Sequence, residues 1–275
     1  MPYDPKTKCY PYTEITDRHY LVVKKDDGTV FDKNYPYIDK SAGYRFKRFL
    51  MRCALVTVAF PVTYLNLGLK VKGRKNLREA KKLLKDGAVS VSNHIHMWDY
   101  LAVMLALFPR KTSILAWDKN MRGENKTLIR LNGGIPVPVN DPRATAAMSK
   151  AVLDYLKEGG WLHVAAEGSM WEYYMPVRPF KKGAFWFSVK SGKPVLPMGF
   201  SYREAKGIQK LFYKHGLITL NIGKPLFPDE SLPNKDAIRK LTVEAHEAVC
   251  RLCGIEPSEN IYPPVFEQNR RVDYY

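Results

Sequence analysis

The stretch VSNHIHMWDYLAV, residues 91–103, places two histidines and one aspartate within six positions. His94 and Asp99 are five residues apart, a spacing that separates two side chains on a continuous helix. If His94 lies in a turn and Asp99 in the first turn of the following helix, the carboxylate reaches an imidazole nitrogen and fixes its tautomer. The other nitrogen is then left as a general base. We therefore expect proton transfer by His94, with Asp99 as its partner.

The same residues are compatible with other chemistry. A metallo-hydrolase site could use His94, His96 and Asp99, although the pattern departs by one residue from HxHxDH and Tyr100 replaces the last histidine. A serine nucleophile is available in Ser169 of AAEGSMW, a stretch that lacks the second glycine of GxSxG. A histidine that only caps or packs is the third alternative.

Short β-rich segments alternate with helical ones beyond residue 70. This pattern predicts an α/β fold: a single layered domain with a mixed, largely parallel sheet flanked by helices. The expected strands are 69–73, 88–93, 112–117, 133–140, 161–167, 194–200 and 217–223. The expected helices are 77–84, 98–107, 125–131, 143–157, 180–191 and 235–252. His94 then follows the carboxyl end of a strand, where such folds collect their active sites.

The main domain is expected to span residues 45–256. Residues 1–44 form an N-terminal extension with a hairpin around Asp26, Asp27 and Gly28, and residues 257–275 form a C-terminal arm. The first residues lack the apolar core of a signal peptide, so export by that route is not expected.

An uncharged run at residues 53–69 has the length of a short membrane segment, and basic residues flank both of its ends. A spanning helix usually has its basic excess on one side, whereas an interfacial segment on an anionic leaflet uses both. We therefore predict an N-terminal membrane-associating helix at residues 49–69, in a peripheral or monotopic protein.

The chain has 44 Lys and Arg against 27 Asp and Glu, a net charge of +17, which indicates an anionic partner. Nucleic acid is one such partner, but no recognition motif is present, and the uncharged run favours a phospholipid surface. Four scattered cysteines indicate reduced thiols in an intracellular setting. Cys250 and Cys253 fit the end of a helix capped by Gly254 better than a metal site.

Four motifs in order resemble the glycerolipid acyltransferase family, the lysophosphatidic acid acyltransferase-like proteins. The resemblance covers about residues 45–230. The second motif is in LIRLNGGIPVPVN, and RPFKKGAFWFSVKSGKPVLPMGF is similar to the segment that leads to the fourth. The residues that carry the resemblance are Asn93, His94 and Asp99 in the first motif, Gly133 and Gly134 in the second, and Glu167, Gly168 and Ser169 in the third.

The resemblance implies direct acyl transfer from acyl-CoA or acyl carrier protein to a lysolipid hydroxyl, with no metal and no cofactor. His94 is then the base, Asp99 stabilises the imidazolium, and Glu167 organises the acceptor pocket together with Gly168 and Ser169. The expected acceptor is 1-acylglycerol 3-phosphate, at the cytoplasmic face of a membrane.

Two departures concern the acceptor phosphate. The family's second and third motifs usually carry arginines, and these fall here at Val139 and Met170. A neutral or sugar-bearing head group, held by the aromatic residues of 171–174, is therefore the alternative acceptor. The cations that could replace the arginines are Arg143, Arg178, Lys181 and Lys182.

Overall fold

The computed structural model describes residues 25–260, except 172–173, 175 and 214–215. Its strands are β1 (Lys70–Lys72), β2 (Ala88–Ser92), β3 (Thr112–Trp117), β4 (Gly134–Val137), β5 (Trp161–Ala165), β6 (Val195–Arg203) and β7 (Leu217–Ile222). Its α-helices are α1 (Ala42–Ala54), α2 (Phe60–Leu67), α3 (Arg74–Glu79), α4 (Asp99–Leu107), α5 (Lys126–Leu131), α6 (Pro142–Lys157), α7 (Gly183–Ser191), α8 (Gln209–Phe212) and α9 (Asn234–Cys253). A π-helical turn, Leu55–Ala59, joins α1 to α2, and a 3-10 turn, Pro257–Glu259, follows α9.

The seven strands form one sheet in the order β1-β7-β6-β2-β5-β3-β4. All neighbouring strands are parallel except β6 and β7, which form an antiparallel hairpin. Strand β2 is central, and its five residues AVSVS are all buried, as expected for a strand covered on both faces. The predicted fold class, a mixed and largely parallel sheet flanked by helices, is confirmed.

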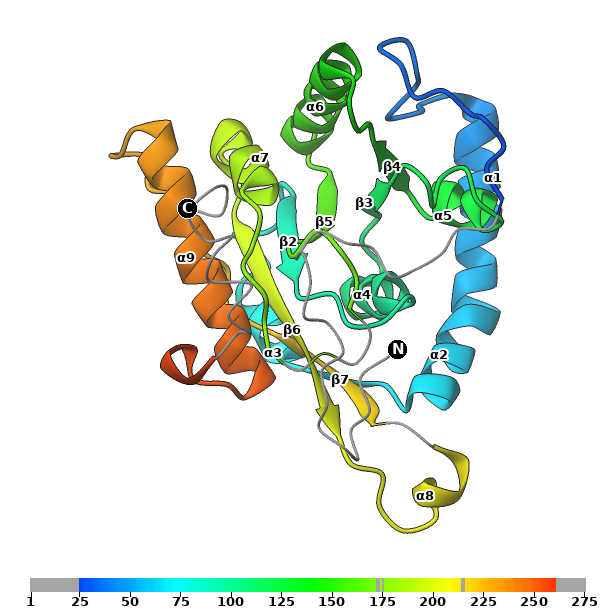
Figure 1. Ribbon diagram of the computed structural model, residues 1–275, viewed down its shortest axis with the longest axis vertical. Helices are drawn as coiled ribbons and strands as arrows, with labels where there is room; N and C mark the ends of the chain where they lie inside the picture. Colours follow the sequence, from blue (N-terminus) through cyan, green and yellow to red (C-terminus); the bar gives the residue numbers. More distant parts are fainter. Residues whose placement is uncertain (1–24, 172–173, 175, 214–215, 261–275) are drawn as a thin grey trace.

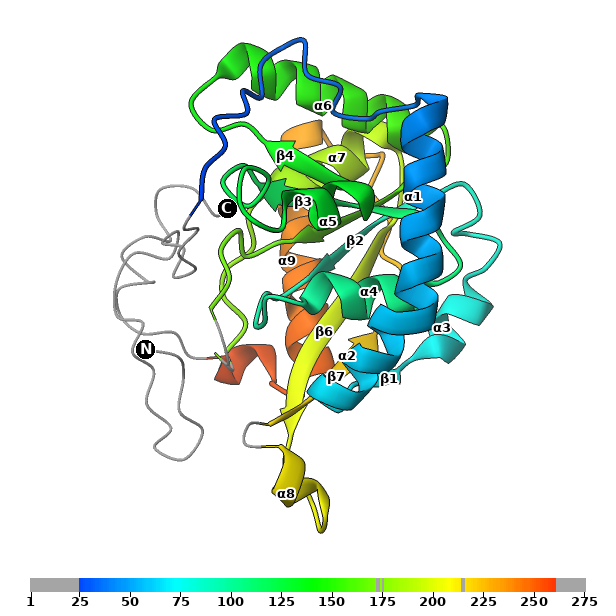
Figure 2. The same ribbon diagram turned by 90° about the vertical axis from the view of Figure 1, so that its right-hand side faces the viewer.

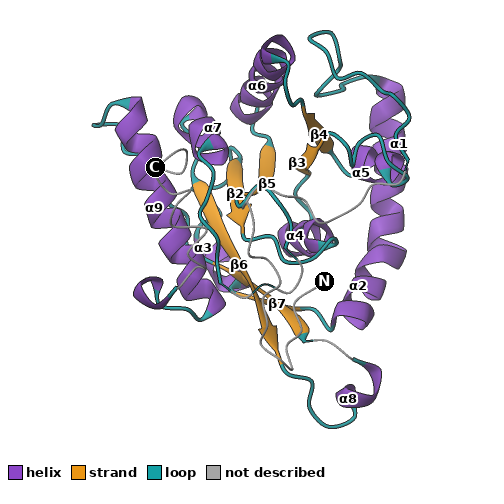
Figure 3. Ribbon diagram, in the orientation of Figure 1, coloured by secondary structure: helices purple, strands orange, loops and turns teal. Residues whose placement is uncertain are grey.

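Helices cover both faces of the sheet (Figures 1 and 3). One core contains Val89 and Val91 of β2 together with apolar residues of α6, α7 and α9. The other contains Ala88 of β2 with residues of α3 and α4. Because side chains alternate along a strand, β2 contributes to both cores and its carboxyl end is fixed between the two layers.

Local signals explain where the helices begin and end. The carboxylate of Asp141 accepts hydrogen bonds from the backbone N–H groups of Arg143 and Ala144, and Pro142 occupies the first position of α6. Helix α9 ends at Gly254, which has a φ of 81°. The CxxC stretch is therefore the end of a capped helix, as the sequence indicated.

Residues 42–67 form one continuous helical segment along the side of the domain (Figures 1 and 2). It begins seven residues before the predicted start at 49 and ends two before the predicted end at 69. It is long and apolar enough to cross a membrane. Its most apolar 18-residue stretch has a mean hydropathy of 1.5, and only 11% of that stretch is buried. Pro61 lacks an N–H group, and the wider π turn before it accommodates the missing hydrogen bond.

One side of this helix packs on the domain. Arg48 donates to the carbonyl of Thr112, and Leu55 is buried against α4. The other side exposes apolar residues to solvent: Phe46, Phe49, Leu50, Val56, Val58, Val62, Tyr64 and Leu65.

The predicted N-terminal hairpin lies partly outside the described residues. Its described part forms a turn in which Asp26 accepts from the N–H of Gly28, followed by residues without strand structure. An ion pair between Asp27 and Lys126 attaches this segment to α5. Of the predicted C-terminal arm, residues 261–275 lie outside the described range.

Candidate active site

His94 and Asp99 meet at the carboxyl end of β2. Nδ1 of His94 lies 3.1 Å from Oδ2 of Asp99. An ionised carboxylate only accepts hydrogen bonds, so the imidazole carries its proton on Nδ1 and its lone pair on Nε2. No hydrogen bond to Nε2 is present among the described residues, and the His94 side chain is 26% exposed. This geometry suits a general base that takes a proton at Nε2.

Asp99 also fixes the shape of the turn. Its Oδ2 accepts from the backbone N–H groups of Ile95, at 2.8 Å, and His96, at 3.1 Å. As the first residue of α4, the buried carboxylate lies at the positive end of the helix dipole. His96 accepts from the N–H of Trp98 through its own Nδ1 and so helps to close the turn. His94 and Asp99 can therefore be in contact although they are five residues apart, because the chain turns before α4 begins.

A buried ion pair holds the backbone of His94. Glu167 is 3% exposed, and its Oε2 accepts from the His94 N–H at 2.9 Å and from Arg178 Nη2 at 2.8 Å. Its Oε1 accepts from the Arg178 N–H at 2.7 Å. Burial raises the pKa of Glu167, and the charge of Arg178 opposes that shift. The His94 carbonyl accepts from the N–H of Trp171, so both backbone groups of this residue are fixed.

Arg178 is buried and paired with Glu167, whereas a residue that binds a substrate phosphate must reach the surface of the site. Its side chain is 1% exposed. The guanidinium donates to Glu167 and to Ser169, and it lies over the ring of Trp171 with 4.6 Å to the centroid. The sequence prediction of Arg178 as an acceptor ligand needs revision, because these contacts engage its charge inside the fold. Ser169 is also fully buried, so it does not present a nucleophile at the surface.

Asn93 attaches the turn to the neighbouring strand. Its amide nitrogen donates to the carbonyl of Phe200 at 3.0 Å, and its amide oxygen accepts from the N–H of Phe200 at 2.8 Å. The side chain thus continues the pairing of β2 with β6 for one further residue. Tyr202, on the same strand, donates to the carbonyl of Ile95. Strand β6 and the His94 turn therefore form one connected unit.

His163 of β5 is a site neighbour that sequence reasoning missed. It is 4% exposed, with Nδ1 3.0 Å from the hydroxyl of Ser90 and Nε2 3.4 Å from that of Ser92. Burial, together with the charge of His94, lowers the pKa of His163 to about 3. The imidazole of His163 is therefore uncharged at neutral pH, close to the turn that carries His94. In the sequence, the signal for a buried histidine was its position among the apolar residues of a predicted strand.

Lys181 lies against the third motif. Its backbone N–H donates to the carbonyl of Ala166 at 2.7 Å, and its side chain passes over Gly168. A Cβ at Gly168 would lie 2.6 Å from Cε of Lys181, and the φ of 82° also favours glycine. Lys182 is half-buried at the N-cap of α7. Met170, where the family usually has an arginine, is buried.

The other predicted residues lie farther from His94. Arg143 is exposed at the start of α6, after β4, and β4 is three strands from β2, about 14 Å at the usual strand spacing. Gly133 has a φ of 90°, and a Cβ there would lie 2.3 Å from a guanidinium nitrogen of Arg48. A Cβ at Gly134 would lie 2.6 Å from Cγ2 of Ile129. The two glycines allow α1 and α5 to approach the sheet.

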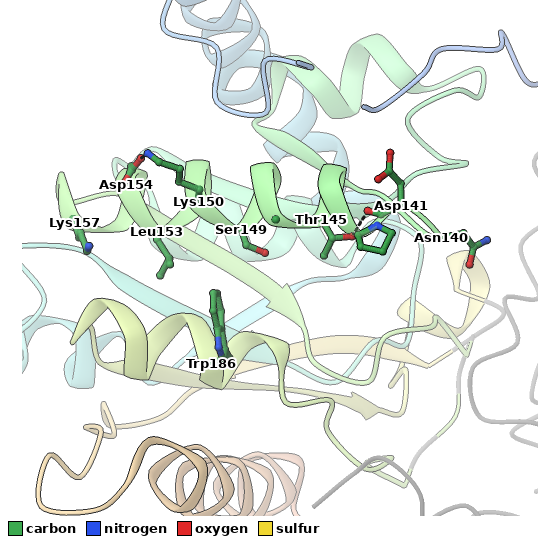
Figure 4. A pocket seen from close by; sticks show the side chains of 11 residues that line it. Asn140, Asp141, Thr145, Ser149, Lys150, Leu153, Asp154, Lys157 and Trp186 are labelled. Carbon is green, nitrogen blue, oxygen red and sulfur yellow. Dashed lines mark hydrogen bonds and ion pairs between the residues drawn. The ribbon is translucent and has the colours of Figure 1, made fainter. Parts of the chain in front are cut away.

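A groove with a volume of about 940 Å³ runs between α6 and α7. Trp186 of α7 faces Thr145, Ser149 and Leu153 of α6 across it (Figure 4). Neither His94 nor Asp99 lines this groove, so the groove is separate from the His94–Asp99 pair.

The metal alternative requires several ligand side chains gathered around one point. Within residues 25–260, as far as they are described, no group of three or more His, Cys, Asp or Glu side chains is arranged to hold a metal ion. His96 accepts a hydrogen bond from Trp98. Cys250 is buried, and burial raises the pKa of its thiol to about 12, which disfavours the thiolate that a metal needs.

Residues 68–201 match the family model described as Acyltransferase. This range of the chain is an acyltransferase domain. The matched range of this acyltransferase contains the His94–Asp99 pair, Glu167 and Arg178, and the family predicted from the four motifs is confirmed. The acyltransferase is also similar to the crystal structure of the 1-acyl-sn-glycerophosphate (LPA) acyltransferase from Thermotoga maritima. The identity is 21% and the TM-score 0.48, over 77% of this chain and 84% of that one. A comparison with curated proteins found no match.

Proposed function

We propose that this acyltransferase moves a fatty acyl group from a thioester to the free hydroxyl of a lysophospholipid-like acceptor. The observation that carries the proposal is the pairing of His94 with Asp99 in a rigid turn inside the acyltransferase domain. This pair leaves Nε2 of a partly exposed imidazole available for a substrate proton.

The reaction follows from this geometry. Nε2 of His94 takes the proton of the acceptor hydroxyl while the oxygen attacks the thioester carbonyl. Asp99 stabilises the imidazolium through Nδ1. The tetrahedral intermediate then collapses, the carbon–sulfur bond breaks, and the leaving thiolate takes the proton from the imidazolium. The products are an ester and a free thiol, and no covalent bond to the protein forms.

The preferred acceptor is 1-acylglycerol 3-phosphate, and the donor is acyl-CoA or acyl carrier protein. Lys181 and Lys182 support a phosphate head group, because they are cations close to the third motif at the start of α7. The net charge of +17 favours anionic substrates and an anionic membrane. The exposed apolar side of Ala42–Leu67 supports a peripheral or monotopic position at the membrane face where these donors occur, the cytoplasmic face.

A neutral or sugar-bearing lysolipid is the second candidate acceptor. It is favoured because Val139 and Met170 stand where two arginines were expected, and Arg178, a candidate replacement for them, is engaged with Glu167. The discriminating experiment offers the purified protein a panel of lysolipids that differ only in head group. Each is tested with labelled acyl-CoA and acyl carrier protein, and the products are identified by mass spectrometry. Preferred acylation of the phosphate acceptor supports the first candidate, and preference for a neutral one supports the second.

A further inference from the structure

The β6–β7 hairpin extends beyond the rest of the domain (Figures 1 and 2). Its tip, residues 203–213, contains the short helix α8. Three apolar side chains of the tip are among the most exposed in the described chain: Ile208 at 71%, Leu211 at 79% and Phe212 at 76%. Three large apolar side chains on one protruding turn are unusual for a surface that contacts only water.

The hairpin tip is connected to the apolar helix. The hydroxyl of Tyr213 donates to the carbonyl of Leu65, near the end of α2. Leu65 is itself 70% exposed. Both views place α8 at the end of the molecule where α2 ends (Figures 1 and 2). The exposed apolar side of Ala42–Leu67 and the hairpin tip are thus neighbouring surfaces.

The charge around the tip favours an anionic partner. Residues 203–213 contain three basic residues and one acidic residue, Glu204. Lys206 and Lys210 are exposed beside the apolar side chains, and Lys70 and Lys72 are exposed on β1 after α2. Apolar side chains bordered by lysines are typical of segments that enter the interface of an anionic bilayer.

The hairpin tip also lies at the same edge of the sheet as His94. Strand β6 runs parallel to β2, so its carboxyl end, which continues into the tip, is at the edge where the catalytic turn follows β2. The root of the tip contacts that turn, because Tyr202 donates to the carbonyl of Ile95. A membrane contact at the tip would therefore bring the His94 edge toward the bilayer.

We propose that the hairpin tip is a second membrane contact, which inserts Ile208, Leu211 and Phe212 into the interface of an anionic phospholipid bilayer. This inference rests on the membrane association in the proposed function and adds an orientation to it. One contact at Ala42–Leu67 leaves the domain free to rotate about the helix. A second contact at the tip fixes the edge of the sheet that carries His94 at the depth where a lysolipid hydroxyl is found.

The direct test measures the depth of the tip in the membrane. Phe212→Trp is mixed with vesicles of phosphatidylcholine and phosphatidylglycerol, with and without bromine on the acyl chains. Bromine quenches indole fluorescence at short range, so we expect more quenching than in the unmodified chain with its five tryptophans. The control is Phe227→Trp, because Phe227 is 49% exposed but follows Leu226, which pairs with Val195 at the opposite end of β6.

A second measurement tests affinity. Replacement of Ile208, Leu211 and Phe212 by serine should weaken vesicle binding about tenfold or more, since each side chain loses apolar burial. The same replacement of exposed apolar residues elsewhere, Val30 and Leu83, should change it little. Turnover of a micellar acceptor should be retained, because none of these residues lies in the catalytic turn.

The outcomes separate this inference from the proposed function. Equal quenching of Phe212→Trp and the unmodified chain on bound vesicles overturns the tip contact alone. A concentration-dependent blue shift of Phe212→Trp without vesicles also overturns it, because the tip then binds another copy of the chain. No vesicle binding by the unmodified chain overturns the membrane association as well. Quenching of Phe212→Trp in a protein that acylates no lysolipid leaves the tip contact standing and rejects the proposed reaction.

Discussion

His163 allows a quantitative prediction about pH and stability. We propose the substitution His163→Gln, which keeps a polar side chain next to Ser90 and Ser92 but removes the titrating group. In the folded protein, burial and the charge of His94 hold the pKa of His163 at about 3, against an ordinary value of 6.5. The unfolded chain therefore binds a proton at this position between these pH values, while the folded chain stays neutral.

The expected magnitude follows from this difference in proton binding. The contribution of His163 to stability is fully present above pH 6.5 and is lost as the pH falls toward 3. Each pH unit in this window removes about 1.36 kcal/mol from the free energy of unfolding. A change from pH 7 to pH 5 should therefore destabilise the unmodified chain by about 2 kcal/mol more than His163→Gln.

The assay is urea unfolding of both proteins at pH 7 and pH 5 in the same mild detergent, followed by tryptophan fluorescence. Other titrating groups contribute equally to both proteins, so the difference between the two pH dependences isolates His163. The same pH dependence in both proteins would refute the reasoning, since it would mean that His163 is protonated alike in the folded and unfolded states.

Three further predictions concern the ion pair, the acceptor and the membrane. Glu167→Ala should lower the free energy of unfolding by about 3 to 5 kcal/mol, because the charge of Arg178 is left buried without a partner. The double change Glu167→Ala with Arg178→Met should cost less than the sum of the single changes. Additive losses in urea unfolding would contradict the pairing. Lys181→Ala should raise KM for a phosphate-bearing acceptor roughly tenfold or more and leave a neutral acceptor unchanged, while Lys190→Ala, exposed in the last turn of α7, serves as the control. Equal losses on both acceptors would remove Lys181 from the phosphate site. Serine at exposed apolar positions of Ala42–Leu67 should move the protein from the membrane pellet to the soluble fraction, and unchanged pelleting would contradict an anchoring role for this helix.

Much of the fold follows from local pattern. The segment TSILAW coincides with β3, and LITLNIG exceeds β7 by one residue, because β-branched residues between turn signals define strands well. The start of α6 was predicted at residue 143, one residue after its observed start at Pro142, which follows the Asp141 cap. These elements depend on neighbours in sequence, and sequence therefore predicts them.

Long-range contacts were outside the reach of the sequence. The contact of His94 with Asp99 is local, and the sequence predicted it on the condition that a turn precedes the helix; the structure shows it at 3.1 Å. Nothing local indicated that Arg178 turns inward to Glu167, eleven residues away, since an arginine in a basic chain is usually solvated. The exposed tip at α8 was missed for a similar reason, because four helical residues between two strands have no periodic pattern.

In the proposed reaction, His94 is the base of the acyl transfer. The most direct measurement is the turnover of His94→Ala with a labelled acyl thioester and the preferred lysolipid, in protein whose circular dichroism and urea unfolding match the unmodified chain. The imidazole is partly exposed in a turn that Asp99 and Glu167 hold through backbone groups, so its removal should leave the fold intact. We predict a loss of kcat of at least about 10²-fold. Near-normal turnover by folded His94→Ala would contradict the mechanism.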